Sequence, residues 1–198
     1  MPFVGLTGGM GAGKSTALAA LERLGAAVLS SDAVVHELYE GEPLRAAVVD
    51  RWGAAVAPGG VVDRSAVAER AFAGEEDRRW LEGLLWPLVG ARVAAWLEEV
   101  RGGSDGARPR PRAAVVEVPL LFEAGLEGLY DATIAIVAEE EVRRERASTR
   151  GHALANERAA RQLSQEEKAR RATFVVHNDG TEEELERGLS AVLDKLSR

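Results

Sequence analysis

Short runs of apolar residues recur along this chain and predict five buried strands. The runs span residues 3–7, 27–29, 113–118, 132–137 and 173–176. Each is bounded by glycine, proline or polar residues, as is typical of strands that are buried on both faces of a sheet. The segments between the runs have helical composition or spacing. Strands that alternate with helices predict a parallel five-stranded sheet in a three-layer α/β fold.

The second crossover, residues 32–112, is far longer than one helix. We expect helices there over residues 33–39, 44–52, 64–72 and 75–101. Apolar positions recur at three- and four-residue spacing in the last of these, and Pro87 should kink or split it. We expect a helical lobe inserted after the second strand, beside the carboxyl ends of the strands, where such folds bind ligands. Residues 102–112 are expected to form an exposed loop.

Helix signals also mark the C-terminal part of the chain. Helices are expected over residues 139–149 and 154–162. Ser164 has the features of an N-cap followed by an acidic first turn. Thr181 and Glu184 have the spacing of a capping box that opens the last helix.

Composition narrows the class of protein. A chain of 198 residues that is 46% hydrophobic suits one α/β domain. The net charge of −7 argues against a general nucleic-acid binder, and the lack of cysteine excludes disulfides and thiolate metal sites. No apolar run approaches the ~20 residues of a membrane span, and no signal peptide is recognisable. We expect a cytoplasmic monomer, with at most weak self-association, no membrane partner and small-molecule substrates.

The segment from Gly8 to Ser15 has the spacing G-x-x-x-x-G-K-[ST] and lies between the first strand and a helix-forming stretch. Strand, glycine loop and helix together are the context of a phosphate-binding P-loop. Backbone N–H groups and the helix dipole would hold phosphate oxygens. Lys14 would reach the β- and γ-phosphates, and the Ser15 hydroxyl would ligate Mg²⁺. The expected ATP-binding residues are Gly9, Met10, Gly11, Ala12, Gly13, Lys14, Ser15 and Thr16.

Two carboxylates stand near the same edge of the predicted sheet. Asp32 directly follows the second strand, where it would either accept the proton of an attacking hydroxyl or cap the next helix. Glu117 lies inside a buried strand, where an unpaired carboxylate is costly. It would either approach Mg²⁺ through water or make a structural hydrogen bond. We favour surface positions for His36 and His152, because no second ligand has metal-binding spacing.

Residues 143–171 contain nine basic and four acidic residues. Five arginines follow a glutamate by four residues and are expected to form exposed ion pairs; they are Arg143, Arg144, Arg161, Arg170 and Arg171. Arg146 and Arg150 have helical spacing as two like charges, and no glutamate stands four positions before Arg146, Arg150 or Arg158. This arrangement predicts a basic lid that closes over a triphosphate.

Several motifs together resemble those of the dephospho-coenzyme A kinases, and the resemblance covers essentially the whole chain. Residues 5–16 are similar to the opening of that family. Residues 31–36 resemble its D-A-D stretch, with Asp32 at the second aspartate, and residues 118–123 reproduce its P-L-L-F-E segment. The remaining matches are Arg146 and Arg150 at R-x-x-x-R, then Arg158, Gln162, Lys168 and Asn178-Asp179-Gly180.

The resemblance implies ATP-dependent phosphorylation of the ribose 3′-hydroxyl of dephospho-CoA, the last step of CoA synthesis. It implies a nucleotide-binding core of residues 1–31, 113–142 and 173–198, a CoA-binding lobe of residues 32–112, and a lid of residues 143–172. Asp32 is implied as general base, with Lys14, Arg146 and Arg150 at the phosphates and Asn178 and Gly180 beside the adenine. The implied acceptor site comprises Thr7, Asp32, His36, Trp86, Pro119, Leu120, Leu121 and Phe122.

Three positions depart from the family pattern: Trp86 replaces a histidine, Ser30 replaces the first aspartate, and Thr173 replaces an aspartate before the last strand. Trp86 would be able to stack on a base. Another small-molecule P-loop kinase, of nucleoside monophosphate or shikimate type, is the nearest alternative. A non-catalytic nucleotide-binding regulator is the second. A GTPase would carry N-K-x-D, which the sequence lacks.

Overall fold

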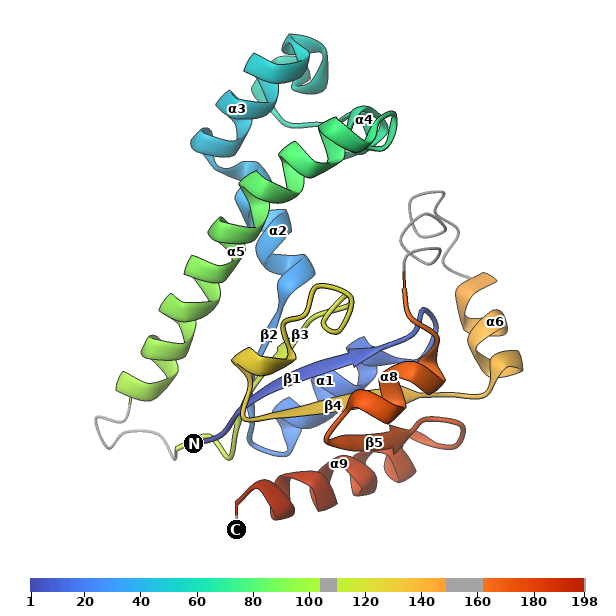
Figure 1. The fold of residues 1–198 in the computed structure, drawn as a ribbon. Coiled ribbons are helices and arrows are strands. Elements are labelled where there is room, and N and C mark those ends of the chain that lie inside the picture. The colour runs from blue at the N-terminus through green and yellow to red at the C-terminus, as the bar shows by residue number, and fades with distance from the viewer. Residues whose placement is uncertain (104–109, 149–161, 198) are drawn as a thin grey trace. The chain divides into compact units, whose positions relative to one another are not determined.

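Five parallel strands in the order β2-β3-β1-β4-β5 form the sheet of this computed structural model, which describes residues 1–103, 110–148 and 162–197 (Figure 1). The strands are β1 (Phe3–Gly8), β2 (Ala27–Ser30), β3 (Ala114–Glu117), β4 (Ala132–Val137) and β5 (Phe174–His177). The predicted α/β fold with a five-stranded parallel sheet is therefore confirmed. β1 lies at the centre, paired with β3 and β4. The glycine loop therefore leaves the middle of the carboxyl edge.

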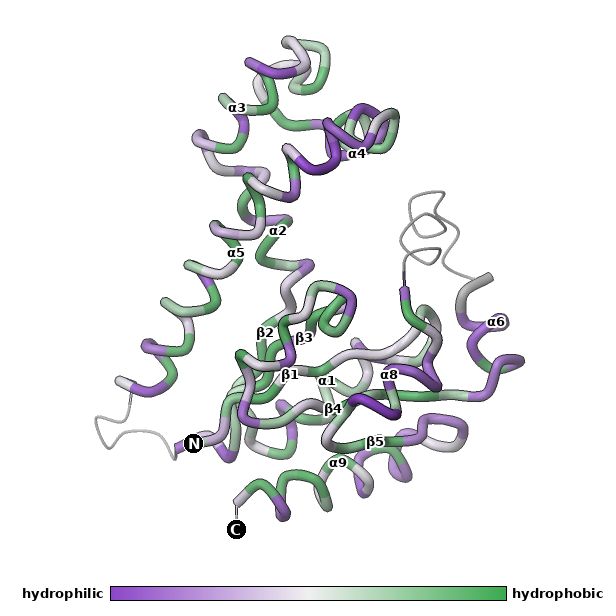
Figure 2. Tube along the Cα trace, in the orientation of Figure 1, coloured by the Kyte–Doolittle hydropathy of each residue, from purple (hydrophilic) through white to green (hydrophobic). Residues whose placement is uncertain are grey.

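The two faces of the sheet are covered by different helices. Side chains of β1 and β4 alternate, and those of Leu6 and Ile134 enter a core with Leu21 of α1 (Lys14–Arg23) and Leu189 of α9 (Glu182–Leu196). The short helix α8 (Gln165–Arg171) packs on β4 and β1 from the opposite face (Figure 1). In Figure 2 the central strands are predominantly hydrophobic, as expected of strands that lie between two layers.

The insertion after β2 is helical, as predicted. It contains α2 (Ser31–Glu40), α3 (Glu42–Trp52), the 3₁₀ turns η1 (Ala54–Val56) and η2 (Pro58–Gly60), α4 (Arg64–Phe72) and most of α5 (Glu75–Gly102). Residues Ser31–Trp96 form one compact unit, and residues 1–30 with 97–198 form the other. The helical unit has its own core, which includes Leu44, Val48, Val67 and Leu81. Trp52 and Trp80 meet edge to face in it, with centroids 5.0 Å apart.

α5 runs from Glu75 to Gly102 as one helix with Pro87 inside it. Of the two outcomes expected at Pro87, a kink or a split, the split is therefore wrong. A proline removes one backbone hydrogen bond and crowds the preceding turn. The turns on either side remain helical, and Leu81 on the N-terminal side is anchored in the core of the helical unit.

The predicted helix caps are confirmed. The Ser164 hydroxyl accepts from the backbone N–H of Glu167 at 3.2 Å. Thr181 and Glu184 form the reciprocal capping box at the start of α9. The helix α6 covers Glu140–Ser148 and η3 covers Glu127–Leu129. The helix expected over residues 154–162 and most of the loop expected over residues 102–112 lie outside the described residues. No described helix is long and apolar enough to cross a membrane.

Candidate functional site

The loop after β1 is curled in a way that only glycine allows. Gly11 has a φ of 76° and Gly13, the N-cap of α1, has a φ of 89°. A Cβ atom on Gly11 would overlap the carbonyl of Arg143, and one on Gly13 would overlap the side-chain amide of Asn178. The atoms that such a Cβ would overlap belong to segments more than 100 residues away in the sequence. The loop therefore fits against these two segments only as bare backbone.

Positive charge is concentrated at the start of α1. The Lys14 ammonium group donates to the carbonyls of Gly8 and Gly9, at 3.2 and 3.3 Å, and so lies back along the loop. Ser15 is exposed in the first turn of α1, and that turn contains no acidic residue. Backbone N–H groups, a helix N-terminus and an ammonium group at one place form an anion-binding site.

Asn178 and Arg146 meet at the glycine loop. Nδ2 of Asn178 donates to the carbonyl of Ala12 at 2.8 Å, and Nη1 of Arg146 donates to the carbonyl of Asn178 at 3.0 Å. The structure thus brings together Lys14, Arg146 and Asn178, three residues that sequence analysis assigned to the nucleotide. Gly180 lies against the Glu184 carboxylate, which would have to shift to admit a side chain there. Arg150 lies outside the described residues.

Arg143 also lies at the loop, which sequence analysis did not predict. Its carbonyl packs against Gly11, and its Nη1 would lie 3.0 Å from a Cβ atom on Gly9. The expected ion pair with Glu139 required both side chains to project from the same face within the helix. Glu139 instead precedes α6, accepts from the Arg143 N–H through its carbonyl and thus occupies the N-cap. Only the packing of α6 on the loop reveals this position of Arg143; no local sequence signal does.

The other expected arginine pairs have mixed outcomes. Arg144 pairs with Glu140 as predicted. Arg170 pairs with Glu167, and not with Glu166. Arg171 pairs with Glu127 and lies over the ring of Phe122, 5.1 Å from its centroid, and so leaves the helix face on which Glu167 was expected to meet it. Arg158 and Arg161 lie outside the described residues.

The P-L-L-F-E segment takes part in a buried polar network on the α8 side of the sheet. Nζ of Lys168 donates to the carbonyl of Pro119 at 2.7 Å, to Oγ1 of Thr7 at 3.4 Å and to Oε1 of Glu123 at 2.9 Å. The Lys168 side chain is completely buried, and burial lowers its pKa although Glu123 opposes the shift. Leu121 and Thr7 are also completely buried. In the sequence Lys168 is recognisable only as part of a motif, because its buried role depends on contacts with distant residues.

The remaining residues of the segment differ in exposure. Phe122 is buried beneath Arg171, whereas Pro119 and Leu120 are half-buried. Of the segment's four predicted acceptor-site residues, Pro119 and Leu120 are the two with side chains that reach the surface.

The departures at Ser30 and Thr173 are both explained by hydrogen bonds. The Ser30 hydroxyl donates to Oε2 of Glu117 at 2.8 Å. Glu117 has 7% of its surface exposed, and this bond is the structural hydrogen bond that was one of the two roles expected for it. The Thr173 hydroxyl accepts from the backbone N–H of Thr133 at 3.0 Å and joins β5 to β4. Asp32 is exposed in the first turn of α2, which begins at Ser31. Its alternative role as the N-cap of a helix starting at Ala33 is therefore wrong.

In the helical unit, two predicted acceptor residues are exposed. Nδ1 of His36 is hydrogen-bonded to the Arg64 guanidinium group, and Nε2 lies 3.8 Å from Glu40. Trp86 lies on α5 with 47% of its surface exposed. His152 lies outside the described residues. Within the described ranges, no cluster of three or more histidines and acids could hold a metal ion by itself.

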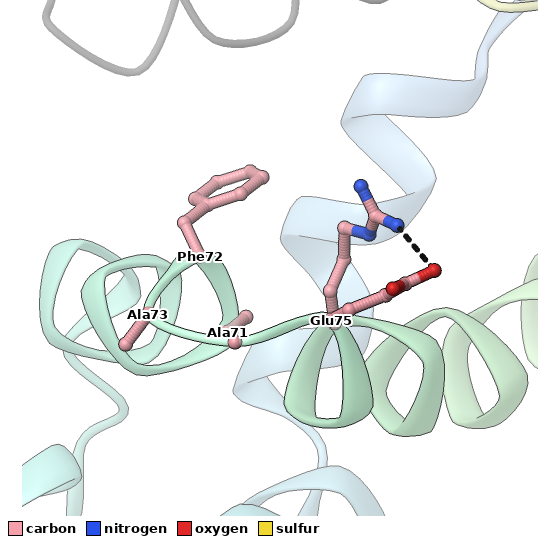
Figure 3. A pocket seen from close by; sticks show the side chains of 6 residues that line it. Ala71, Phe72, Ala73 and Glu75 are labelled. Carbon is pink, nitrogen blue, oxygen red and sulfur yellow. Dashed lines mark ion pairs between the residues drawn. The ribbon is translucent and has the colours of Figure 1, made fainter.

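A shallow hollow of about 360 Å³ lies where α4 meets α5 (Figure 3). Phe72, Arg78 and Glu75 line it, and Arg78 lies 3.8 Å from Glu75. The hollow contains none of the residues that sequence analysis assigned to the site.

Comparison with known proteins identifies the family. A sequence profile described as dephospho-CoA kinase matches residues 2–184. The dephospho-CoA kinase of Anaeromyxobacter dehalogenans is 42% identical over 190 residues, which covers 93% of this chain and 87% of that protein. The enzyme of Deinococcus radiodurans is 40% identical over 196 residues, covering 98% and 91%.

Solved structures agree on the fold. A crystal structure from Thermus thermophilus is 34% identical, with a TM-score of 0.79, and covers 100% of this chain and 99% of that one. The dephospho-CoA kinase from Campylobacter jejuni shares the fold at 21% identity, with a TM-score of 0.68 and coverage of 98% and 96%. The chain belongs to the dephospho-CoA kinase family, the ATP-dependent kinases that complete CoA biosynthesis.

Proposed function

We propose that this protein transfers the γ-phosphoryl group of ATP to the ribose 3′-hydroxyl of dephospho-CoA at the carboxyl edge of β1. The observation that carries the proposal is the convergence of Lys14, Arg146 and Asn178 on one glycine loop. These residues come from three separate parts of the chain, and two of them bring positive charge to a loop whose N–H groups already favour anions.

On the donor side, the backbone of residues Gly9 to Thr16 binds the triphosphate, and Lys14 exchanges its two loop carbonyls for β- and γ-phosphate oxygens. Arg146 lies beside Gly13, with Nη1 3.8 Å from where a Cβ atom would be. From there it stabilises charge that develops on the transferred group. Asn178 and Gly180 border the adenine. Arg150 is assigned to the same phosphates by the family motif alone.

On the acceptor side, Asp32 accepts the proton of the attacking hydroxyl. It is exposed and stands two residues beyond the end of β2, where a carboxylate at the sheet edge has access to substrate. Pro119 and Leu120 in the sheet unit, and His36 and Trp86 in the helical unit, are assigned to the acceptor, and each of them reaches the surface of its own unit. Thr7, Leu121 and Phe122 shape the pocket from beneath, because their side chains are buried.

The residues present fit a magnesium ion that accompanies the nucleotide. Mg²⁺ in such sites keeps several waters and takes one or two protein ligands together with phosphate oxygens. The Ser15 hydroxyl is exposed at the loop, and Ser30 occupies only Oε2 of Glu117, which leaves Oε1 for a water-mediated contact. When bound, the ion neutralises charge on the β- and γ-phosphates.

We assign residues 1–31, 113–142 and 173–198 to the nucleotide-binding core, residues 32–112 to the CoA-binding lobe and residues 143–172 to the lid. The compact helical unit ends earlier, at Trp96, because the end of α5 is grouped with the sheet. A cytoplasmic monomer remains the expected form.

An acceptor panel tests the proposal. ATP consumption is measured with dephospho-CoA, AMP, shikimate or no acceptor, with and without Mg²⁺. The proposal expects stimulation by dephospho-CoA alone and a product phosphorylated at the 3′-hydroxyl. Stimulation by AMP or shikimate would establish the alternative kinase class. ATP binding without turnover on any acceptor would favour a regulator.

A further inference from the structure

Arg143 is held against the glycine loop by its own backbone. Its carbonyl and Cα atom lie where a side chain on Gly11 would be, so the first turn of α6 packs directly on the loop. This contact fixes the start of the Arg143 side chain. The side chain then extends to Gly9, where Nη1 would be 3.0 Å from a Cβ atom.

The Arg143 guanidinium group has unused hydrogen-bonding capacity at this place. Its Nε is buried and has no hydrogen-bond acceptor among the residues that the structure describes. A buried charged donor without an acceptor carries a desolvation cost of a few kcal/mol. An acceptor that arrives with a ligand would remove this cost.

The described polar groups beside Arg143 do not accept a hydrogen bond from its Nε. Both ends of the Gln165 amide are bonded to the backbone of Ala138. Glu166 is exposed; its pKa is lowered first by a hydrogen bond from its own backbone N–H, then by the Ser164 hydroxyl, and in a smaller part by the Arg143 charge. Arg143 thus acts on Glu166 through charge, while its Nε remains unsatisfied.

Arg143 and Arg146 are three residues apart on α6 and therefore share one face of the helix. One guanidinium group lies at Gly9 and the other at Gly13, so they flank the loop at two points. Arg144 lies on a different face and is paired with Glu140. α6 therefore presents two arginines to the loop and one to solvent.

We propose that Arg143 is a phosphate-binding residue of this site, which donates to the ATP triphosphate on the Gly9 side of the loop while Arg146 donates on the Gly13 side. The inference rests on the proposed function, because it needs the triphosphate to bind at this loop. It assigns phosphate binding to Arg143, for which the sequence predicted an exposed ion pair with Glu139.

The test compares Arg143→Gln with Arg144→Gln, which makes the same chemical change on the same helix away from the loop. Binding of ATP, inorganic tripolyphosphate and adenosine is measured by calorimetry or competition. We expect Arg143→Gln to weaken the binding of ATP and of tripolyphosphate by about 10–100-fold, which corresponds to the loss of a charged hydrogen bond. The affinity for adenosine should be unchanged. Arg144→Gln should change none of these three affinities by more than about twofold. The affinity of Arg143→Lys for ATP and tripolyphosphate should lie between those of the native chain and Arg143→Gln, since lysine keeps the charge but loses the planar guanidinium group.

Other outcomes would overturn the inference. Equal affinities for the two glutamine variants would show that Arg143 does not contact phosphate. A lower unfolding temperature without ligand in Arg143→Gln, combined with unchanged tripolyphosphate affinity in Arg143→Lys and Arg143→Gln, would show an anchor for α6 only. Failure of the proposed function is distinguishable, because the unmodified protein would then lack turnover with dephospho-CoA.

Discussion

The side-chain amide of Asn178 donates a 2.8 Å hydrogen bond to the carbonyl of Ala12, and both residues are buried. The bond joins the turn after β5 to the glycine loop after β1, across 166 positions of sequence. Since Arg146 donates to the carbonyl of the same Asn178, one residue fixes the loop on one side and positions an arginine on the other.

Replacement of Asn178 by alanine should therefore affect both stability and nucleotide binding. It leaves the buried Ala12 carbonyl without its donor, a loss of about 1–3 kcal/mol in the free energy of unfolding. The KM for ATP should rise because the loop is less rigid. Urea unfolding and ATP-dependent kinetics measure the two effects.

His177→Ala is the matched control, because its side chain is 75% exposed one residue earlier. It should change the free energy of unfolding by less than about 0.5 kcal/mol. If both variants lose the same amount, the Asn178 bond does not stabilise the loop.

Asp32→Asn should nearly abolish phosphoryl transfer and leave ATP affinity and the unfolding temperature close to those of the native chain. The amide has the same size but cannot accept a proton from the attacking hydroxyl. Single-turnover kinetics and ATP binding separate the two effects. Asp50→Asn makes the same change at an exposed position of α3 and should be neutral. Retention of most turnover by Asp32→Asn would exclude Asp32 as the base.

Arg146→Ala should lower turnover by up to about 10³-fold, as for other arginines that stabilise a phosphoryl transition state. Steady-state kinetics with saturating ATP measure the effect. Arg144→Ala is the control, because Arg144 pairs with Glu140 on a different face of α6. Similar losses in both variants would mean that the stability of α6, rather than the Arg146 contact, limits the rate.

Much of the sheet was predictable because the central strands obey a local rule. Strand β4 covers Ala132–Val137, the predicted span, and each of its residues is buried. A strand covered on both faces requires an uninterrupted apolar run, and such a run is visible in the sequence. Helix caps were predictable for the same reason, because Thr181 and Glu184 interact within one turn.

The neighbours of the loop were less predictable because tertiary packing decides them. The i,i+4 rule for Arg143 and Glu139 assumed that Glu139 lies within the helix, whereas α6 begins one residue later, at Glu140. Lys168 and Glu123 are 45 residues apart, and nothing local indicates that they meet inside the protein. The rule for proline within a helix likewise omits the packing that holds α5 together around Pro87.

Lys168→Met should destabilise the protein by about 3–5 kcal/mol, the usual loss when one partner of a buried ion pair is removed. Methionine fills similar space, but Glu123 would keep an uncompensated charge, since among the described residues only the Leu163 N–H also donates to it. The double variant Lys168→Met/Glu123→Gln removes that charge and should recover part of the loss. Urea unfolding of both singles and the double measures the coupling.

Lys195→Met on the exposed side of α9 is the matched control and should be close to neutral. If the two single losses simply add in the double variant, Lys168 and Glu123 do not stabilise each other.

The protein should lose stability between about pH 10 and pH 12 through Tyr130. Burial against Phe3 and Gly5 raises the pKa of Tyr130 from 10.0 to about 12. Below pH 10 the phenol is protonated in both states, and its contribution is fully present. As the pH rises through this window, the unfolded chain loses the proton first, so the free energy of unfolding falls by up to about 2.7 kcal/mol. Urea unfolding at several alkaline pH values should show this slope in the native chain and a shallower one in Tyr130→Phe. Identical slopes would mean that Tyr130 ionises as readily in the folded protein as in the unfolded chain.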